Sequence, residues 1–239
     1  MKRKHPFVKN HIYHIYNRGV EKRDIFLDDN DRWRFLQGLY LFNDQRKTGN
    51  LLWELEKTRG KVNFRVLREH RKILDSEGTP LVRIIADCLM PNHFHLLLEE
   101  LTPGGITKFM HKLGTGYGGY FNQKYKRVGG LFQGRFKSIL VDNDLYLQYL
   151  LVYINVLNPA QLIEPNLKEE GIKDMELVMQ FAENYPWSTH QEYLGKRNSH
   201  FIDKGIFTNL LPSPKSYKAL VRNVLEEKKY HLISHIILE

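Results

Sequence analysis

Cysteine and long hydrophobic runs are both scarce in this sequence. Cys88 is the one cysteine among 239 residues, so no disulfide can form within the chain. A single thiol suits a reducing compartment and argues against the small secreted proteins that disulfides hold together. Between Asp87 and Leu89 we expect Cys88 to be a small core residue. No window approaches the ~20 apolar residues of a membrane-spanning helix, so we expect no membrane association.

Acidic residues are also in deficit. The 27 Asp and Glu residues are outnumbered by 36 Lys and Arg, which gives a net charge of +9 and a pI of about 9.4. Such a balance favours polyanionic partners, because each phosphate neutralised by the protein releases condensed counterions. The charge alone is a hint, since basic proteins of other functions are common. Residues 1–6 are basic but lack the apolar stretch of a signal peptide, so we expect a cytoplasmic protein.

Residue patterns predict an alternation of strands and helices. Alternating or continuous β-forming residues predict strands at 11–16, 81–90, 93–99 and 131–141. Acidic caps or Pro-Gly predict helices after residues 28–31, after Pro103 and from 142–144 to about Leu157, where Asn158-Pro159 should end the last one. Four glycines between 114 and 119 should weaken the middle helix by up to about 1 kcal/mol each.

This order of elements predicts an α+β fold. Strand, helix, strand, strand, helix, strand is the order of a ferredoxin-like split βαβ sandwich, an antiparallel sheet with helices on one face. We assign this domain to residues 1–159, with a charged insertion at about 43–79 that has some helix near 66–74. Residues 160–239 should form a mostly helical C-terminal extension, with a turn at 185–188.

Two histidines form the first candidate site. His93 and His95 lie two residues apart in one predicted strand, so both side chains project from the same face, about 6.5–7 Å apart. Two neutral imidazoles at this spacing can bind one divalent ion and leave positions for a third ligand and phosphate oxygens. Two ordinary surface histidines are the alternative. We expect this sheet face to be open, so that truncating either side chain removes the metal site but leaves the fold nearly intact.

Several motifs carry a resemblance to a known family. Residues 90–97 (MPNHFHLL) resemble the histidine motif of the HUH nucleases, and specifically of the single-tyrosine and REP-associated tyrosine transposases. Supporting segments follow in the same order along nearly the whole chain: 13–19 (YHIYNRG), 132–138 (FQGRFKS), 153–155 with 158–159, and 186–188. The resemblance implies that the histidine pair binds Mg²⁺ or Mn²⁺ over a scissile DNA phosphate. It also implies attack by a tyrosine, which leaves a 5′-phosphotyrosine link and a free 3′-OH.

The helix predicted before Asn158 offers the candidate nucleophiles. Tyr146, Tyr149 and Tyr153 lie on one continuous helical face. An aromatic core stripe is the alternative reading of this pattern, and we prefer it for Tyr146. The family pattern of an acidic cap, a Tyr-Leu pair and a Tyr-Ile before Asn-Pro assigns the nucleophile to Tyr153. Tyr149, one turn away, is the second candidate.

The third metal ligand is where this chain departs from the family. Five residues, 154–158, separate Tyr153 from the proline, whereas the family pattern has four. The resemblance implies an amide four residues beyond the tyrosine, but Leu157 occupies that place. Asn158 can serve if the helix contains a bulge, and Asn155 is a poorer candidate.

The same motif segments supply candidates for DNA contacts. Arg18, Arg135 and Lys137 lie on predicted strands and can hold backbone phosphates, although solvated surface charges are about as common. Asn17 and Gln133 complete this set of candidates.

The sequence therefore predicts a cytoplasmic, metal-dependent transposase or nicking–joining enzyme for single-stranded or hairpin DNA, either monomeric or homodimeric. Two alternatives stay open. One is a DNA-binding protein on the same fold without catalysis, and the other is a metal-dependent phosphoesterase that uses water. His93, His95 and Tyr153 together argue against the first alternative, because binding alone requires none of them.

Overall fold

The computed structural model describes residues 6–46, 51–60, 62–73 and 78–226. Four antiparallel strands form one sheet in the order β2-β3-β1-β4. Their bounds are β1 (Ile12–Arg18), β2 (Val82–Met90), β3 (His93–Glu100) and β4 (Lys137–Val141). Helix α1 (Asp29–Phe42) follows β1, and α4 (Gly105–Lys124) follows β3. This is the predicted ferredoxin-like arrangement.

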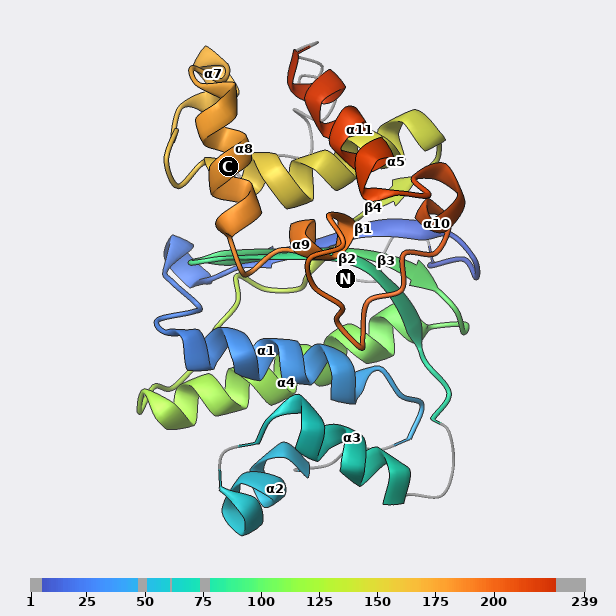
Figure 1. The fold of residues 1–239 in the computed structure, drawn as a ribbon. Coiled ribbons are helices and arrows are strands. Elements are labelled where there is room, and N and C mark those ends of the chain that lie inside the picture. Colours follow the sequence, from blue (N-terminus) through green and yellow to red (C-terminus); the bar gives the residue numbers. More distant parts are fainter. Residues whose placement is uncertain (1–5, 47–50, 61, 74–77, 227–239) are drawn as a thin grey trace.

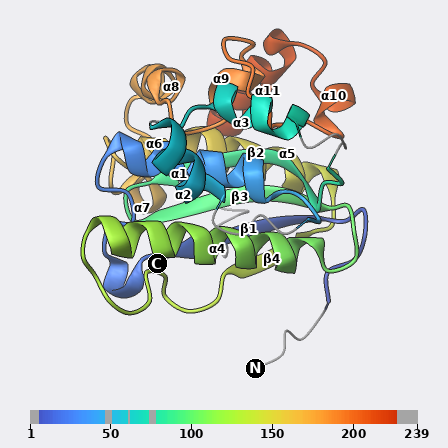
Figure 2. The same cartoon turned by 90° about the horizontal axis from the view of Figure 1, so that it is seen from below.

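Helices α1 and α4 pack side by side beneath one face of the sheet (Figures 1 and 2). Helix α4 runs unbroken through its four central glycines. A Cβ at Gly116 would lie 2.6 Å from the Phe42 ring, so glycine here allows α1 and α4 to approach closely. Outside them lie α2 (Leu51–Arg59) and α3 (Phe64–Ile73), within the predicted insertion. The helix expected near 66–74 is α3, although residue 74 falls outside the described residues; α2 was not predicted.

The opposite face of the sheet is covered as well, so the expectation of an open histidine face was wrong. Helix α5 (Asp144–Val152), the π-helix η2 (Tyr153–Leu157) and α6 (Asn158–Ala160) run as one continuous helical segment across it. The predicted stop at Asn158-Pro159 is therefore early, since the helix includes both residues. Figure 1 shows α8 (Met175–Asn184) and α11 (Pro214–Glu226) on this same side.

The C-terminal part of the chain is helical, as predicted. Up to residue 226, where the described part ends, it contains α8, α11 and three short helices, α7 (Leu167–Glu170), α9 (His190–Tyr193) and α10 (Phe207–Leu210). The predicted turn near Pro186 leads into an extended segment along the outer edge of β2. There the amide of Leu89 donates to the carbonyl of Trp187 at 2.8 Å, and Ser188 forms a β-bridge with Cys88. No helix in the described ranges is long and apolar enough to cross a membrane.

Strand β4 is shorter than the sequence predicted. Residues 131–136 form a loop that stays attached to the end of β1 without regular pairing, through an isolated bridge between Gly19 and Phe132 and a bond from the amide of Gln133 to the carbonyl of Arg18 at 2.8 Å. Gly134 has φ +76°, a left-handed conformation that ends regular strand pairing. The short 3₁₀ helix η1 (Val20–Lys22) follows β1 at the same end of the sheet.

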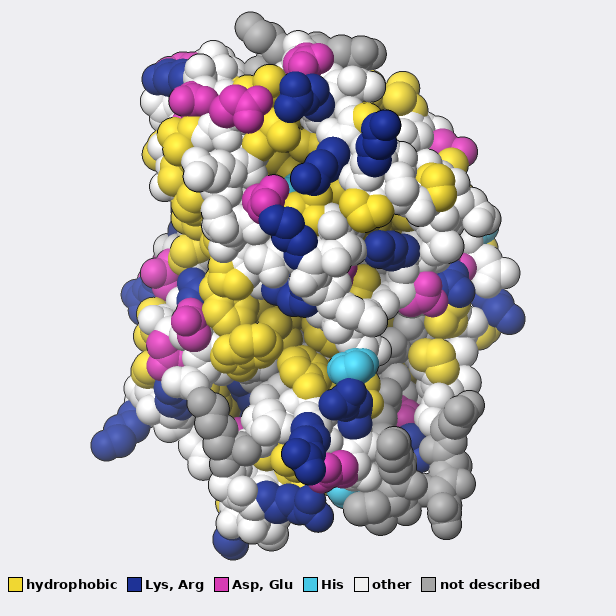
Figure 3. Space-filling view, viewed as in Figure 1, with side chains coloured by type: hydrophobic (Ala, Val, Ile, Leu, Met, Phe, Trp, Pro, Cys, Tyr) yellow, Lys and Arg dark blue, Asp and Glu magenta, His cyan; other side chains and the backbone are white. Residues whose placement is uncertain are grey.

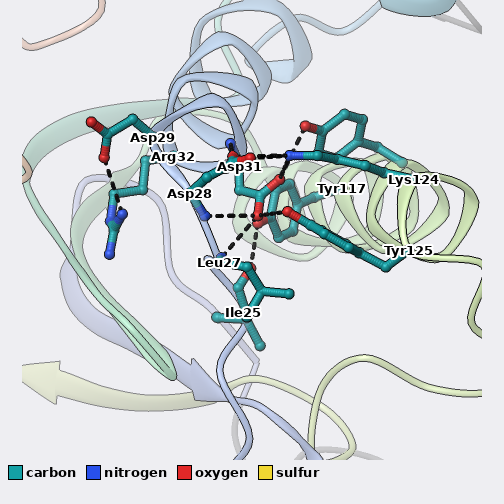
Figure 4. Close-up of polar contacts among 10 residues, drawn as sticks. Ile25, Leu27, Asp28, Asp29, Asp31, Arg32, Tyr117, Lys124 and Tyr125 are labelled. Carbon is teal, nitrogen blue, oxygen red and sulfur yellow. Dashed lines mark hydrogen bonds and ion pairs between the residues drawn. The ribbon is translucent and has the colours of Figure 1, made fainter.

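A buried carboxylate joins the start of α1 to the end of α4 (Figure 4). Asp28 and Asp31 form a capping box at the N-terminus of α1. Asp31 is fully buried and accepts from Lys124 Nζ at 2.7 Å and from the Tyr125 hydroxyl at 2.8 Å. It also accepts from the amide of Leu27 at 2.8 Å. One side chain therefore satisfies a helix cap and ties the two helices of this layer together.

We predict that Asp31→Ala lowers the free energy of unfolding by about 3 kcal/mol, because it leaves buried donors without an acceptor. The matched control is Asp29→Ala, two residues earlier. The Asp29 side chain is 72% exposed and forms a surface ion pair with Arg32, so its loss should cost less than about 1 kcal/mol. Urea unfolding of both variants measures the difference, and equal values would refute the role given to Asp31.

Candidate active site

The register of β1 against β3 brings a third histidine to the predicted pair. Arg18 lies opposite His93, and Tyr16 lies opposite His95. Directly opposed residues of antiparallel strands face the same side, so the alternate residue His14 shares this face. His14 was not among the site residues predicted from the sequence. The alternation of β1 was the signal that could have placed it beside the pair.

The three imidazoles are in contact. His14 Nε2 and His95 Nδ1 are 2.7 Å apart, and their rings stack with centroids at 4.9 Å. The His93 and His95 rings stand edge to face, with centroids at 5.1 Å. His93 Nδ1 bonds the side-chain oxygen of Asn92 at 2.6 Å. His95 Nε2 is buried and has no hydrogen-bond partner among the residues that the structure describes.

Burial keeps all three rings neutral. It lowers the pKa of His14 to about 3, with the ring fully enclosed. It is also the main reason that the pKa of His93 falls to about 4, with a smaller lowering effect from Lys168 and an opposing one from the Asn158 side chain. The pKa of His95 is well below its usual value, again chiefly through burial. At neutral pH each ring therefore has a nitrogen lone pair, as metal ligation requires.

The bulge on which the third ligand depended is present. Residues Tyr153–Leu157 form a π-helix, and the amide of Asn158 donates to the carbonyl of Tyr153, five residues back. A π-bulge accommodates one extra residue in a helix, which matches the extra residue between Tyr153 and Pro159. As a result the Asn158 side chain acts on the pKa of His93, and its Nδ2 is buried without a hydrogen-bond partner among the described residues.

The alternative amide, Asn155, is used elsewhere. Its oxygen accepts from Thr189 Oγ1 at 2.7 Å, and its nitrogen donates to the Tyr217 hydroxyl at 3.1 Å. Both partners belong to the C-terminal extension. Asn155 therefore fastens the extension to the helix.

Tyr153 is the helix tyrosine that meets the histidines. Its ring lies edge-on to the His95 ring at a centroid distance of 5.6 Å and to His14 at 6.5 Å. Only 3% of the residue is exposed, and burial raises the pKa of the phenol well above its usual value. Tyr149 is also buried, but among the described residues it makes no ring contact with a histidine.

Two cations act on the histidine pair. His93 is partly exposed, whereas His95 is enclosed. Arg18 lies opposite His93 in the sheet and lowers its pKa, and Lys168 lowers the pKa of both His93 and His95. Arg18 also donates from Nε to the side-chain oxygen of Gln133. Lys168 comes from α7, and nothing in the sequence pattern indicated that it would reach the site.

The remaining DNA-contact candidates divide between the two faces of the sheet. Lys137 is exposed and lies opposite Tyr16, on the histidine side. Asn17 points to the other side, where its amide donates to the carbonyl of Gly134 at 3.2 Å. Asn17 and Arg135 line a cavity of about 710 Å³ that Phe94 also borders. These two residues are thus not brought together with the histidine pair.

This set of ligand atoms suits a divalent cation, bound with modest affinity. The described residues contain no group of three or more His, Cys, Asp or Glu side chains that could hold a metal. The candidate ligands are the neutral imidazoles of His93 and His95 and the amide of Asn158, and His95 Nε2 among them is buried and unpartnered within the described residues. An enclosed lone pair without a hydrogen-bond donor fits a cation, so His93, His95 and Asn158 are the residues that would hold it.

Comparison with known proteins supports the resemblance seen in the motifs. Residues 57–156 match a family model described as IS200-like transposase. The matched segment contains both histidines and Tyr153 and ends two residues before Asn158. The resemblance to tyrosine transposases is confirmed over this segment. Among curated proteins, no sequence match was found.

Two solved structures show a distant likeness. One is a REP-associated tyrosine transposase bound to a REP hairpin, with 11% identity and a TM-score of 0.42 over 86% of this chain and 99% of that one. The other is tRNA(His) guanylyltransferase from Saccharomyces cerevisiae, with 9% identity and a TM-score of 0.32 over 78% and 76%. Scores this low carry neither fold nor function from one protein to another.

The covered histidine face changes what truncation of the pair should do to stability. We predict that His95→Ala lowers the free energy of unfolding by about 2–4 kcal/mol, because it opens a cavity and removes the partner of buried His14. His93→Ala, at a partly exposed position, should cost about 1 kcal/mol or less. Thermal or urea unfolding of the two variants tests this order, and equal stability would contradict it.

Proposed function

We propose that this protein, which carries an IS200-like transposase segment, cuts and rejoins single-stranded DNA through a covalent link to Tyr153, with Mg²⁺ or Mn²⁺ as cofactor. The observation that supports this most strongly is the contact of the Tyr153 ring with His95, in a site whose imidazoles are all neutral. A protein that only bound DNA would gain nothing from enclosing these groups together.

The approach of the substrate follows from exposure and charge. His93 is the member of the pair that solvent reaches, so a scissile phosphate would enter beside it. Arg18 and Lys168 provide positive charge at this position. Figure 3 shows further Lys and Arg side chains spread over the upper and lower parts of one face of the molecule, consistent with a polyanionic partner.

In the chemical step, Tyr153 Oη forms a bond to phosphorus as the bond from phosphorus to the 3′ oxygen breaks. The phenol proton is lost and the 3′ oxygen gains a proton, so the products are a 5′-phosphotyrosine and a 3′-OH. Burial holds the phenol protonated in the free enzyme, so the proton must leave as the attack proceeds. A divalent cation held by His93, His95 and Asn158 would polarise the phosphoryl oxygen and offset the developing negative charge. Because one phosphodiester replaces another, rejoining needs no ATP.

The nucleophile is tested by removing one oxygen atom. We predict that Tyr153→Phe binds DNA as the wild type does but forms no covalent protein–DNA adduct on a denaturing gel, since Phe keeps the packing ring. Tyr149→Phe is the matched control, a buried tyrosine one turn away, and it should form the adduct normally. The reverse pattern would assign the nucleophile to Tyr149. Cleavage by wild type without any adduct would support a water-using phosphoesterase.

Substrate form is the second test. Of the two histidines only His93 is partly exposed, so a scissile phosphate must approach it beside the covering helices, and a flexible unpaired strand can adapt to such an approach better than a rigid duplex. We predict that the protein binds and cuts single-stranded or hairpin-bearing DNA in preference to duplex DNA. The logarithm of the affinity should fall linearly with the logarithm of the salt concentration. Matched hairpin, single-strand and duplex oligonucleotides at two salt concentrations measure this.

Each outcome of the substrate test has a separate meaning. Equal cutting of plain duplex would refute the transposase proposal in favour of an ordinary nuclease. Tight hairpin binding with no cutting in Mg²⁺ or Mn²⁺ would support a DNA-binding protein without catalysis.

A further inference from the structure

His14 stands out among the groups that the proposed reaction does not use. It is fully buried, and its Nε2 lies 2.7 Å from His95 Nδ1. Within the part of the chain that the structure describes, its other nitrogen, Nδ1, is buried without a hydrogen-bond partner, as is His95 Nε2. Tyr16 stacks on the His14 ring at a centroid distance of 4.9 Å and holds it in place. The two histidines thus share one hydrogen bond and have one unsatisfied nitrogen each.

Two neutral imidazoles can share this bond in only two ways. If His95 Nδ1–H donates to His14 Nε2, then His95 Nε2 presents a bare lone pair and the proton of His14 sits on Nδ1. If His14 Nε2–H donates instead, then His95 Nε2 carries a proton and cannot bind a cation. Each arrangement leaves one buried donor and one buried acceptor unpaired. The protein contacts therefore do not choose between them, but a cation at His95 Nε2 would.

The other histidine of the pair has its tautomer set by a neighbour. The side-chain oxygen of Asn92 lies 2.6 Å from His93 Nδ1 and can only accept, so this nitrogen carries the proton and Nε2 is bare. The Asn92 amide nitrogen in turn donates to the carbonyl of Lys22, which fixes the orientation of the side chain. His14 occupies the equivalent place behind His95.

We propose that His14 is a positioning residue that accepts a hydrogen bond from His95 Nδ1–H and so directs the lone pair of His95 Nε2 into the site. This rests on the proposed function, since it concerns the cation that the pair would hold. The bond fixes the ring of His95 and makes its free nitrogen a stronger donor, as an outer hydrogen-bond partner does for a metal-bound histidine. Loss of such a partner commonly weakens metal binding about 10–100-fold.

The test measures Mn²⁺ binding to the purified full chain without DNA, by electron paramagnetic resonance of free Mn²⁺. We expect His14→Phe, which keeps a stacking ring but has no acceptor, to bind Mn²⁺ about 10–100-fold more weakly. His14→Gln places an amide oxygen near the position of Nε2 and should bind close to the wild type. His190→Phe is the matched control. His190 is a buried histidine bonded to the Tyr217 hydroxyl at 2.8 Å, and its loss should leave Mn²⁺ binding unchanged.

A second measurement needs no substitution and covers the case in which His14→Phe fails to fold. Nitrogen-15 spectra of the histidine rings, recorded with and without Mg²⁺, report the tautomers. With Mg²⁺ bound, His95 should carry its proton on Nδ1 and His14 should carry its proton on Nδ1. A proton on His14 Nε2 in the Mg²⁺-bound protein would overturn the proposal.

The outcomes separate this inference from the proposed function. If His95→Ala weakens Mn²⁺ binding but a folded His14→Phe binds like the wild type, the metal site stands and the role of His14 is refuted. Equal losses in His14→Phe and His14→Gln would refute the acceptor role as well. If the wild type binds Mn²⁺ no better than His95→Ala does, the metal site and the role of His14 both fall.

Discussion

The antiparallel pairing of β1 with β3 is the constraint on which the rest of the site depends. Its register sets Arg18 beside His93 and Tyr16 beside His95, and it brings His14 within hydrogen-bonding distance of His95. A shift of one residue would move the polar residues of β1 to the α1–α4 side, into an apolar layer. The same register therefore gives the sheet a hydrophobic face toward α1 and α4 and an opposite face that carries the imidazoles. The helical segment α5–η2–α6 covers this second face.

The helix that covers this face does so with an irregularity. In a regular α-helix, Leu157 would lie one turn after Tyr153 on the histidine side, and Asn158 would point elsewhere. The π-turn at Tyr153–Leu157 adds one residue and brings Asn158 to the histidine side instead. The turn also leaves Asn155 facing the C-terminal extension, where Thr189 and Tyr217 hold it. One inserted residue thus serves the site on one side of the helix and the attachment of the extension on the other.

Local patterns in the sequence predicted much of this, and long-range packing explains what they missed. The strands around His93 and the Asp28 cap follow from periodicity and residue type over a few residues. The need for a bulge before Asn158 follows from the resemblance to the family pattern. The covered face and the position of Lys168 depend on how the extension docks, which no local pattern encodes. Strand β4 was overestimated because β-forming residues at 131–136 are overridden by the left-handed backbone at Gly134.

Enclosure of the histidine face has opposing physical consequences. Burial keeps the imidazoles neutral and ready to bind a cation, but it also holds the Tyr153 phenol in its protonated, less nucleophilic form. Positive charge near the phenol would relieve this, since it stabilises the phenolate. Arg18 lies opposite His93, where an incoming phosphate would neutralise it. If a cation binds between His93 and His95 as proposed, it would act next to the Tyr153 ring and would offset the effect of burial on the phenol.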